Sequence, residues 1–333
     1  MLALLMVLSL SVASCGKNQE PKPDPNPDAT PGVTDPTPND PTPDEPTPDA
    51  PTPDKPTPDE PTPDDPTPDD GAFLVEDAEE FKKPFTGYET ITVENGNLQV
   101  GELVLIDASH PYSADKAGEV VRVKSYNVNG FAAVLTSKTT LNFVALRKMQ
   151  EMNSDMQTAL NVTYLLCIQA GYLTNEELTD LHTNYPGEYP EAAGESDLHT
   201  GRAATVSVFT GAMNYPFRNS AVTNVAGWVE ENAHKYGYIM GNDVNENAKL
   251  RYVGVPHATY MQANGLDLAG YLAKLQDGEK LQITDHQDLT WTVYRVEASE
   301  GASSEIQVPT GMTYSISGDN DGGFIVTVKG ICE

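Results

Sequence analysis

Hydrophobic and polar positions follow two different periods along the second part of the chain. Residues 103–106 and 164–168 are short uninterrupted apolar runs, which predict buried strands. Between them, apolar side chains recur at helical spacing from Phe143 to Leu160 and predict one long amphipathic helix. The methionines of this helix, and Cys167 in the second apolar run, fit a packed core better than a metal site or a reactive thiol. This part of the chain therefore predicts mixed helices and strands.

Capping and stop signals predict shorter helices after these elements. Thr174 followed by Glu177 is a capping box, which marks a helix start. Residues 228–236 fit a helix that Gly237 ends in the C′ position. Pro256 in a first helical turn and the apolar positions of residues 268–275 predict two more helices.

Beyond residue 278 the pattern predicts strands. The expected strands are residues 281–283, 291–296, 306–308, 314–316 and 324–328. Residues 317–323 predict the turn of a hairpin; three polar side chains there could suggest calcium, but the register of an EF-hand loop is missing. We predict an α+β fold, with a domain over residues 71–277 and a small all-β appendage over residues 278–333 that packs against it.

Composition separates residues 21–70 from the rest of the chain. Nineteen of the 26 prolines fall there, and from Pro41 to Asp70 the pattern Pro-Thr-Pro-Asp-x repeats six times. Proline fixes φ and removes a backbone donor, so an extended polyproline II spacer is expected rather than a helix or sheet. We predict that residues 15–70 form a disordered stalk. A Pro-rich ligand for a partner protein is the alternative.

The first residues of the chain predict an extracytoplasmic location. The apolar run from Met1 to Val12 is too short to span a bilayer as a helix, and it leads into Val12-Ala13-Ser14-Cys15. This tetrapeptide resembles a bacterial lipobox, although no Lys or Arg precedes the apolar run. The resemblance implies that residues 1–14 are a cleaved signal peptide and that Cys15 carries the lipid anchor of a surface lipoprotein. An ordinary secretory signal with an incidental cysteine is the alternative.

The charge of the chain excludes one class of partner. The 333 residues include 49 acidic and 20 basic side chains, for a net charge of −29. Binding to nucleic acid needs clustered Lys and Arg, and so does electrostatic docking on anionic lipid. Three cysteines are also too few for a disulfide-held scaffold. We therefore expect attachment to the membrane through the lipid anchor and no nucleic-acid partner.

Five separated segments of the domain carry a family resemblance. They are residues 103–112, with His110-Pro111-Tyr112; residues 170–174; residues 196–205; residues 228–238, which start at Trp228; and residues 246–254, which end in Arg251-Tyr252-Val253-Gly254. In order and spacing they resemble the motifs of the VanY-type zinc D-alanyl-D-alanine carboxypeptidases, over about residues 100–275. The resemblance implies the Hedgehog/DD-peptidase-like fold of that family, a zinc cofactor, and peptidoglycan peptides as substrates.

The chain departs from this family at the zinc site. The resemblance assigns the three metal ligands to the positions of Leu198, Thr205 and Lys249, none of which is a good ligand for Zn²⁺. Glu246, the family's general base, and Ser196 are kept. Without zinc no bound water is activated, so we predict no cofactor, no catalysis and no working role for Glu246 as a base.

A displaced ligand would not restore the site. His199 lies one residue beyond the expected ligand and could reach the site through a bulge, but it would supply only one ligand. His234 and His257 have family counterparts that are not ligands. The remaining histidines, His110, His182 and His286, are far apart in the sequence. The family's substrate-facing Arg is also replaced here, by Leu173.

Lys249 leads to the main functional hypothesis. If its ammonium group lies in the former metal pocket near Ser196, with Arg202 or Arg251 nearby, the pocket could bind the C-terminal carboxylate of a peptidoglycan stem peptide. The alternative is an internal ion pair between Lys249 and Glu246 that fills the cavity. Two other functions remain open: an active carboxypeptidase with altered metal ligands, and a structural or adhesive surface protein.

Overall fold

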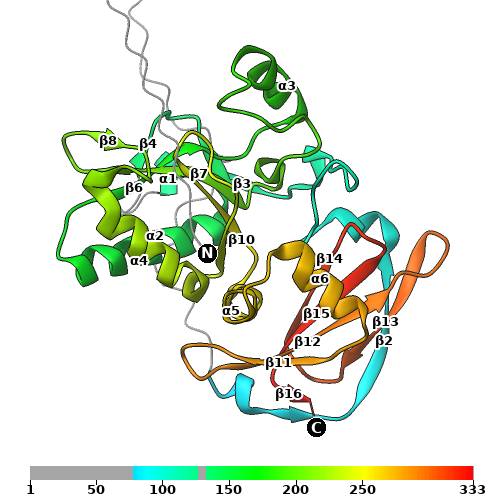
Figure 1. Ribbon diagram of the computed structural model, residues 1–333. Helices are drawn as coiled ribbons and strands as arrows, with labels where there is room; N and C mark the ends of the chain where they lie inside the picture. Colours follow the sequence, from blue (N-terminus) through cyan, green and yellow to red (C-terminus); the bar gives the residue numbers. More distant parts are fainter. Residues whose placement is uncertain (1–77, 127–132, 333) are drawn as a thin grey trace, which may run out of the picture. The chain divides into compact units, whose positions relative to one another are not determined.

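The computed structural model describes residues 78–126 and 133–332 (Figure 1). The predicted signal peptide, the predicted lipidation site at Cys15 and the predicted stalk lie outside the described residues. No helix within the described residues is both long and apolar enough to cross a membrane.

A six-stranded sheet forms the centre of the α/β part of the structure. Its strand order is β4-β6-β7-β10-β9, and β8 pairs with β7. All neighbours are antiparallel except β4 and β6. The strands are β4 (Ala133–Val134), β6 (Leu165–Ala170), β7 (Ala203–Phe209), β8 (Asn214–Tyr215), β9 (Tyr238–Met240) and β10 (Ala248–Tyr252). Strand β6 confirms the strand predicted at residues 164–168.

Helices cover one face of this sheet. They are α2 (Phe143–Leu160), α4 (Thr223–Asn232) and the 3-10 turn η7 (Ala233–Tyr236). The buried side chains of α2 and α4 share one core with Val206 on β7 and Leu250 on β10. Because side chains alternate across a strand, the residues next to these, Thr205 and Lys249, point to the opposite face of the sheet.

Local signals place the helices where the sequence predicts them. The backbone N–H of Glu177 donates to Thr174 Oγ1 and that of Thr174 donates to the Glu177 carboxylate, which completes the capping box of α3 (Asn175–Asn184). Gly237, with φ of 80°, ends η7. The last two predicted helices are α5 (Val255–Asn264), which has a proline in its first turn, and α6 (Leu268–Gln276).

A four-stranded antiparallel sheet, in the order β11-β12-β15-β14, forms the β part of the structure. Its strands are β11 (Leu281–Thr284), β12 (Thr290–Glu297), β14 (Tyr314–Gly318) and β15 (Gly323–Lys329), as the sequence predicts. Val293 and Ile325 on one face pack with α5 and α6. Tyr294 and Val326 on the other face pack with the predicted strand β13 (Ser303–Pro309).

The β part is larger than the predicted appendage. Strand β2 (Tyr88–Glu94) pairs along its whole length with β13, and Ile91 lies opposite Ile306. Strand β1 (Pro84–Phe85) pairs in parallel with β16 (Ile331–Cys332). Residues 84–94, which we had grouped with the preceding domain, therefore complete the β part, because β13 presents apolar side chains that need a partner strand.

Short elements connect these layers. Strand β3 pairs with β5, and α1 follows β3 directly. These elements are β3 (Val120–Arg122), β5 (Thr140–Asn142), α1 (Val123–Tyr126) and the 3-10 turns η1 (Glu80–Lys82), η2 (Asn95–Gln99), η3 (Ala114–Lys116), η5 (Asp197–Thr200) and η6 (Ser220–Val222).

The strand predicted at residues 103–106 is wrong. Leu103 and Val104 are buried as expected, but the segment joins no strand ladder. Its backbone groups bond elsewhere: Leu103 N–H donates to Ser317 Oγ at 2.9 Å, and Val104 O accepts from Arg251 Nη2 at 2.7 Å. An apolar run predicts that a segment is buried, but not that it pairs with a strand. Here side chains from other segments make the backbone hydrogen bonds that a neighbouring strand would make.

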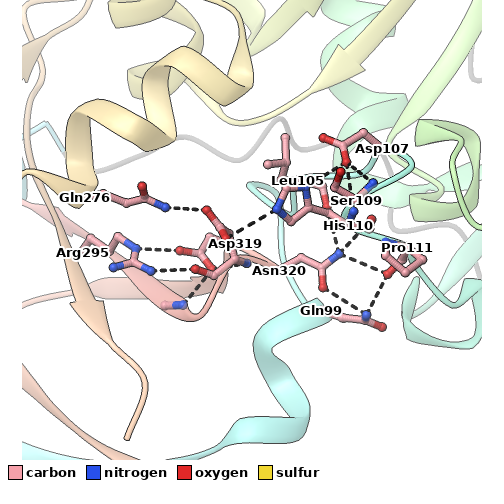
Figure 2. Close-up of polar contacts among 12 residues, drawn as sticks. Gln99, Leu105, Asp107, Ser109, His110, Pro111, Gln276, Arg295, Asp319 and Asn320 are labelled. Carbon is pink, nitrogen blue, oxygen red and sulfur yellow. Dashed lines mark hydrogen bonds and ion pairs between the residues drawn. The ribbon is translucent and has the colours of Figure 1, made fainter.

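The turn between β14 and β15 joins this segment to the β part (Figure 2). Asn320 Nδ2 donates to the carbonyls of Leu105, His110 and Pro111, at 3.0 to 3.2 Å. Within the turn, Asp319 accepts from two backbone N–H groups and from Arg295 Nε. These contacts agree with the predicted hairpin turn rather than the calcium alternative.

Candidate functional site

The sheet face opposite the helices carries two of the three positions that the family resemblance assigns to metal ligands, and the third packs against it. Thr205 on β7 is the direct cross-strand partner of Lys249 on β10, and both are buried. Leu198, on η5, packs against Ala203, which lies two residues before Thr205 on the same face of β7. The fold therefore gathers all three positions at one place.

The surroundings of Leu198 are apolar. Its side chain is 4% exposed and forms a small cluster with Ala170 and Ala203, which Leu173 and Tyr189 cover. No atom of a leucine side chain can coordinate a cation. The position of Leu198 is therefore part of a hydrophobic cluster and not a metal ligand.

A carboxylate that the sequence did not single out lies beside Lys249. Glu191 Oε1 forms an ion pair with Lys249 Nζ, and Glu191 Oε2 accepts a hydrogen bond from Ser196 Oγ at 2.5 Å. The Lys249 side chain is 4% exposed and that of Glu191 is 32% exposed. The buried ammonium group is thus neutralised by a residue that still faces water.

The alternative prediction, an ion pair between Lys249 and Glu246, is wrong because Lys249 pairs with Glu191. Glu246 is exposed, with φ of 63°, in the turn between β9 and β10. Its carbonyl accepts from the backbone N–H of Arg218, which holds the turn. The ammonium group of Lys249 pairs with Glu191 instead, and Glu191 also contacts Ser196.

Arg251, the other predicted substrate-binding cation, is engaged within the fold. Its guanidinium group pairs with Asp197 and donates to the carbonyls of Glu102 and Val104. The side chain is 2% exposed. Arg251 thereby connects β10 to η5 and to the segment around Val104.

The side chains present do not fit a zinc ion. Zinc in proteins takes His, Cys and carboxylate ligands in tetrahedral arrangement. Within residues 78–126 and 133–332, no three such side chains converge. His199 has no free ring nitrogen: Nδ1 lies 2.7 Å from Leu173 O, and Nε2 accepts from Gly194 N at 3.0 Å. Burial lowers the pKa of His199, which favours the neutral ring that these two bonds require.

The other predicted histidines contact groups other than Lys249 and Glu191. His110 Nδ1 contacts Asp107, and His182 Nδ1 contacts the carbonyl of Tyr189. His257 is buried between Tyr271 and Thr327. Neither of the two cysteines in the described residues, Cys167 in the core and Cys332 in β16, forms a disulfide.

A cavity of about 670 Å³ lies elsewhere in the molecule. Its walls come from α2, η7, the start of α5, and the turn between β11 and β12. Ser196, Lys249 and Glu246 are not among its lining residues.

Sequence reasoning missed Glu191 because no motif marks it. The residue follows Pro190 in a loop without regular structure, among 49 acidic side chains in the chain. One signal was available: a lysine at a buried strand position needs a counter-charge, because an unpaired buried ammonium group is costly. That signal predicts that a carboxylate exists but not where it lies in the sequence.

No protein-family model matches the chain, but it is similar to one curated protein and to several solved structures. A D-alanyl-D-alanine carboxypeptidase of Enterococcus faecium is 26% identical over 255 residues, which are 73% of this chain and 79% of the relative. The crystal structure of the vancomycin-resistance D,D-dipeptidase VanXYg, in complex with a D-Ala-D-Ala phosphinate analogue, has a TM-score of 0.59 at 19% identity and covers 73% of this chain and 99% of that one. VanYB in complex with D-alanine-D-alanine has a TM-score of 0.39 at 21% identity, over 52% of this chain and 97% of that one.

These matches confirm two predictions from the sequence. The structural match shows that the α+β fold is that of the D,D-peptidases. The sequence match spans most of both chains and names the same peptidase. Together they show that the chain is similar in sequence to a D-alanyl-D-alanine carboxypeptidase and has the fold of the D,D-peptidases.

Proposed function

We propose that this D-alanyl-D-alanine carboxypeptidase-like domain binds the carboxyl-terminal end of peptidoglycan stem peptides without hydrolysing them. Its signal peptide, the lipid on Cys15 and the Pro-Thr-Pro-Asp stalk would attach it to the membrane at the bacterial cell surface. The relatives' names point to D-Ala-D-Ala peptides as the ligand class. The fold is that of the D,D-peptidases, while the residues that the resemblance assigns to the metal-ligand positions are Leu198, Thr205 and Lys249.

The observation that carries the proposal is the buried ammonium group of Lys249. It lies beside Thr205, and Glu191 contacts both it and Ser196; the family resemblance assigns its position to a metal ligand. A buried cation attracts an anion. When a hydroxyl group donates a hydrogen bond to the second oxygen of a bound carboxylate, it also fixes the orientation of that carboxylate. Lys249 and Ser196 thus suit a carboxylate. Arg251 supports this arrangement through Asp197.

The same geometry argues against hydrolysis. The family's base, Glu246, lies exposed in a turn, and the donor set near it does not fit a metal that would activate water for it. We expect purified protein, supplied with zinc, to release no D-alanine from a D-Ala-D-Ala-terminated peptide. Isothermal titration with that peptide should still show binding. Absence of heat at millimolar peptide would end the binding proposal.

A restored site tests the assignment of the metal positions. The combined change Leu198→His, Thr205→Asp and Lys249→His should create a site that binds zinc stoichiometrically, because the three positions share one face of the fold. Metal analysis after dialysis measures this, with the unchanged protein as the control. Stoichiometric zinc in the unchanged protein would contradict the proposal and favour an active enzyme with altered ligands.

A further inference from the structure

Glu191 lies in the loop that joins α3 to η5, and this loop is fixed on both sides of it. On one side, His182 Nδ1 lies 2.7 Å from the carbonyl of Tyr189. On the other side, Gly194 N donates to His199 Nε2, and Gly194 O accepts from Tyr112 N at 2.8 Å. Between these anchors only residues 190–193 are left. The fold therefore sets the backbone position of Glu191.

Both carboxylate oxygens of Glu191 are used at the site. One oxygen pairs with Lys249 Nζ and the other accepts from Ser196 Oγ. The Lys249 side chain is almost fully buried, whereas about a third of Glu191 is exposed. Glu191 thus covers the ammonium group from the solvent side, where a ligand would have to approach.

The group that Glu191 presents is chemically the end of a peptide. A C-terminal α-carboxylate has the same charge and the same two oxygens in one plane, and it can make the same two contacts. Leu173 and Tyr189, which pack on the buried Leu198, are partly exposed and form an apolar surface in the same part of the fold. Such a surface suits a small apolar side chain on the last residue of a ligand.

We propose that Glu191 is a specificity-determining residue that occupies the carboxylate position of the site and must be displaced by a ligand's own free carboxylate. This inference rests on the proposed binding function and names how that site selects its ligand. A ligand that ends in a neutral group would leave Lys249 buried without a counter-charge, and that state is strongly disfavoured. A ligand that ends in a carboxylate exchanges one counter-charge for another.

The exchange has a measurable consequence for affinity. As long as Glu191 occupies the site, the competent state is only a fraction of the protein, and the apparent dissociation constant equals the intrinsic constant divided by that fraction. Removing the charge of Glu191 therefore strengthens binding of a carboxylate ligand. The effect requires the ammonium group of Lys249, because that group is what both carboxylates share.

Isothermal titration of an acylated peptide ending in D-Ala-D-Ala, against unchanged protein and Glu191→Gln, tests the inference. We expect the variant to bind about tenfold or more tightly than the unchanged protein. The amide of glutamine can still accept from Lys249 and contact Ser196, so this variant keeps the loop in place. Glu188→Gln, a charge change at an exposed residue in the same loop, is the matched control and should bind like the unchanged protein. The same peptide with a C-terminal amide should bind to none of them.

Acetate gives a second readout that does not depend on the peptide. In Glu191→Ala, acetate at constant ionic strength should raise the melting temperature, since it refills the position beside Lys249. It should not do so in the unchanged protein or in Lys249→Met. If Glu191→Ala fails to fold, the peptide titration of Glu191→Gln remains the test.

The outcomes separate this inference from the proposed function. Equal peptide affinity in the unchanged protein and Glu191→Gln would overturn the role of Glu191 and leave peptide binding standing. No peptide binding to any variant, together with acetate stabilisation of Glu191→Ala alone, would overturn peptide binding and support the carboxylate position. Equal acetate effects in all variants would overturn the role of Glu191.

Discussion

Lys249 and Glu191 differ in burial, and this difference decides what each contributes to stability. The Lys249 side chain is 4% exposed and that of Glu191 is 32% exposed. A charge in contact with water can lose its partner at small cost, whereas a buried charge cannot. The ion pair is therefore asymmetric: Lys249 depends on Glu191 more than Glu191 depends on Lys249.

We predict that Glu191→Ala destabilises the protein by about 3 kcal/mol, because it leaves a buried ammonium group without a counter-charge. Lys249→Met should change the free energy of unfolding by less than about 1 kcal/mol, since Glu191 can turn to water and methionine fills the space of the lysine stem. Urea unfolding followed by tryptophan fluorescence measures both. Glu188→Ala is the exposed control. Equal losses for the two variants would contradict this account.

His257 makes a second prediction at the residue scale, about pH. Burial lowers the pKa of its imidazole to about 3, and the ring bonds to Tyr271 Oη at 2.7 Å and to Thr327 Oγ1 at 3.1 Å. The unfolded chain takes up a proton near the ordinary pKa of about 6.5, whereas the folded protein does not until about pH 3. Stability from this residue is therefore complete above about pH 6.5 and is lost as the pH falls below it.

The matching experiment compares the unchanged protein with His257→Gln at pH 7 and pH 5. Between these values the free energy of unfolding of the unchanged protein should fall by about 2 kcal/mol more than that of the variant. The comparison uses the change with pH, so the loss of the two hydrogen bonds in the variant does not enter. Identical pH dependence would show that the ring is not held neutral.

At the scale of elements, the turn between β14 and β15 depends on one carboxylate. Asp319 is fully buried; it accepts from the backbone N–H groups of Asp321 and Gly323 and pairs with Arg295 at 2.7 Å. Figure 2 shows that the next residue, Asn320, reaches the segment around Leu105. Asp319 therefore shapes the hairpin and places the residue that joins it to the rest of the structure.

We predict that Asp319→Ala destabilises the protein by about 3 to 5 kcal/mol, because Arg295 is left buried without its partner and two N–H groups lose their acceptor. Glu297→Gln is the matched control: Glu297 is the other carboxylate near Arg295, at 3.9 Å, but is 84% exposed. The control should stay within about 0.5 kcal/mol of the unchanged protein. A loss below 1 kcal/mol in Asp319→Ala would contradict the buried pair.

Elements governed by local rules were predictable from the sequence, and elements governed by distant partners were not. The capping box at Thr174 and the stop at Gly237 are local, and both are confirmed. The segment at Leu103 is buried by contacts with Ser317 and Arg251, far along the chain, so its apolar run predicted a strand wrongly. Glu191 was missed for the same reason.

On the scale of the whole molecule, the two ends of the described chain build one structure. Strand β2, near the start, pairs with β13, near the end. Helices α5 and α6 pack on the four-stranded sheet that follows them in the chain. In Figure 1 the cyan strand β2 lies beside the orange strand β13. The appendage is thus continuous with the peptidase-like part through shared cores.

This continuity predicts that a fragment of residues 78–277 does not fold. It would expose Tyr271, Leu272 and Leu275, which in the intact protein share a core with Val293 and Ile325. We expect the fragment to bind a hydrophobic dye and to lack a cooperative unfolding transition. Residues 78–333 should unfold cooperatively as the control, because they keep both strands of the β2–β13 pair and the complete core around α6. A fragment of residues 78–277 with native near-UV circular dichroism would show instead that the peptidase-like part holds its shape alone, and the β part would then be an independent addition rather than half of the fold.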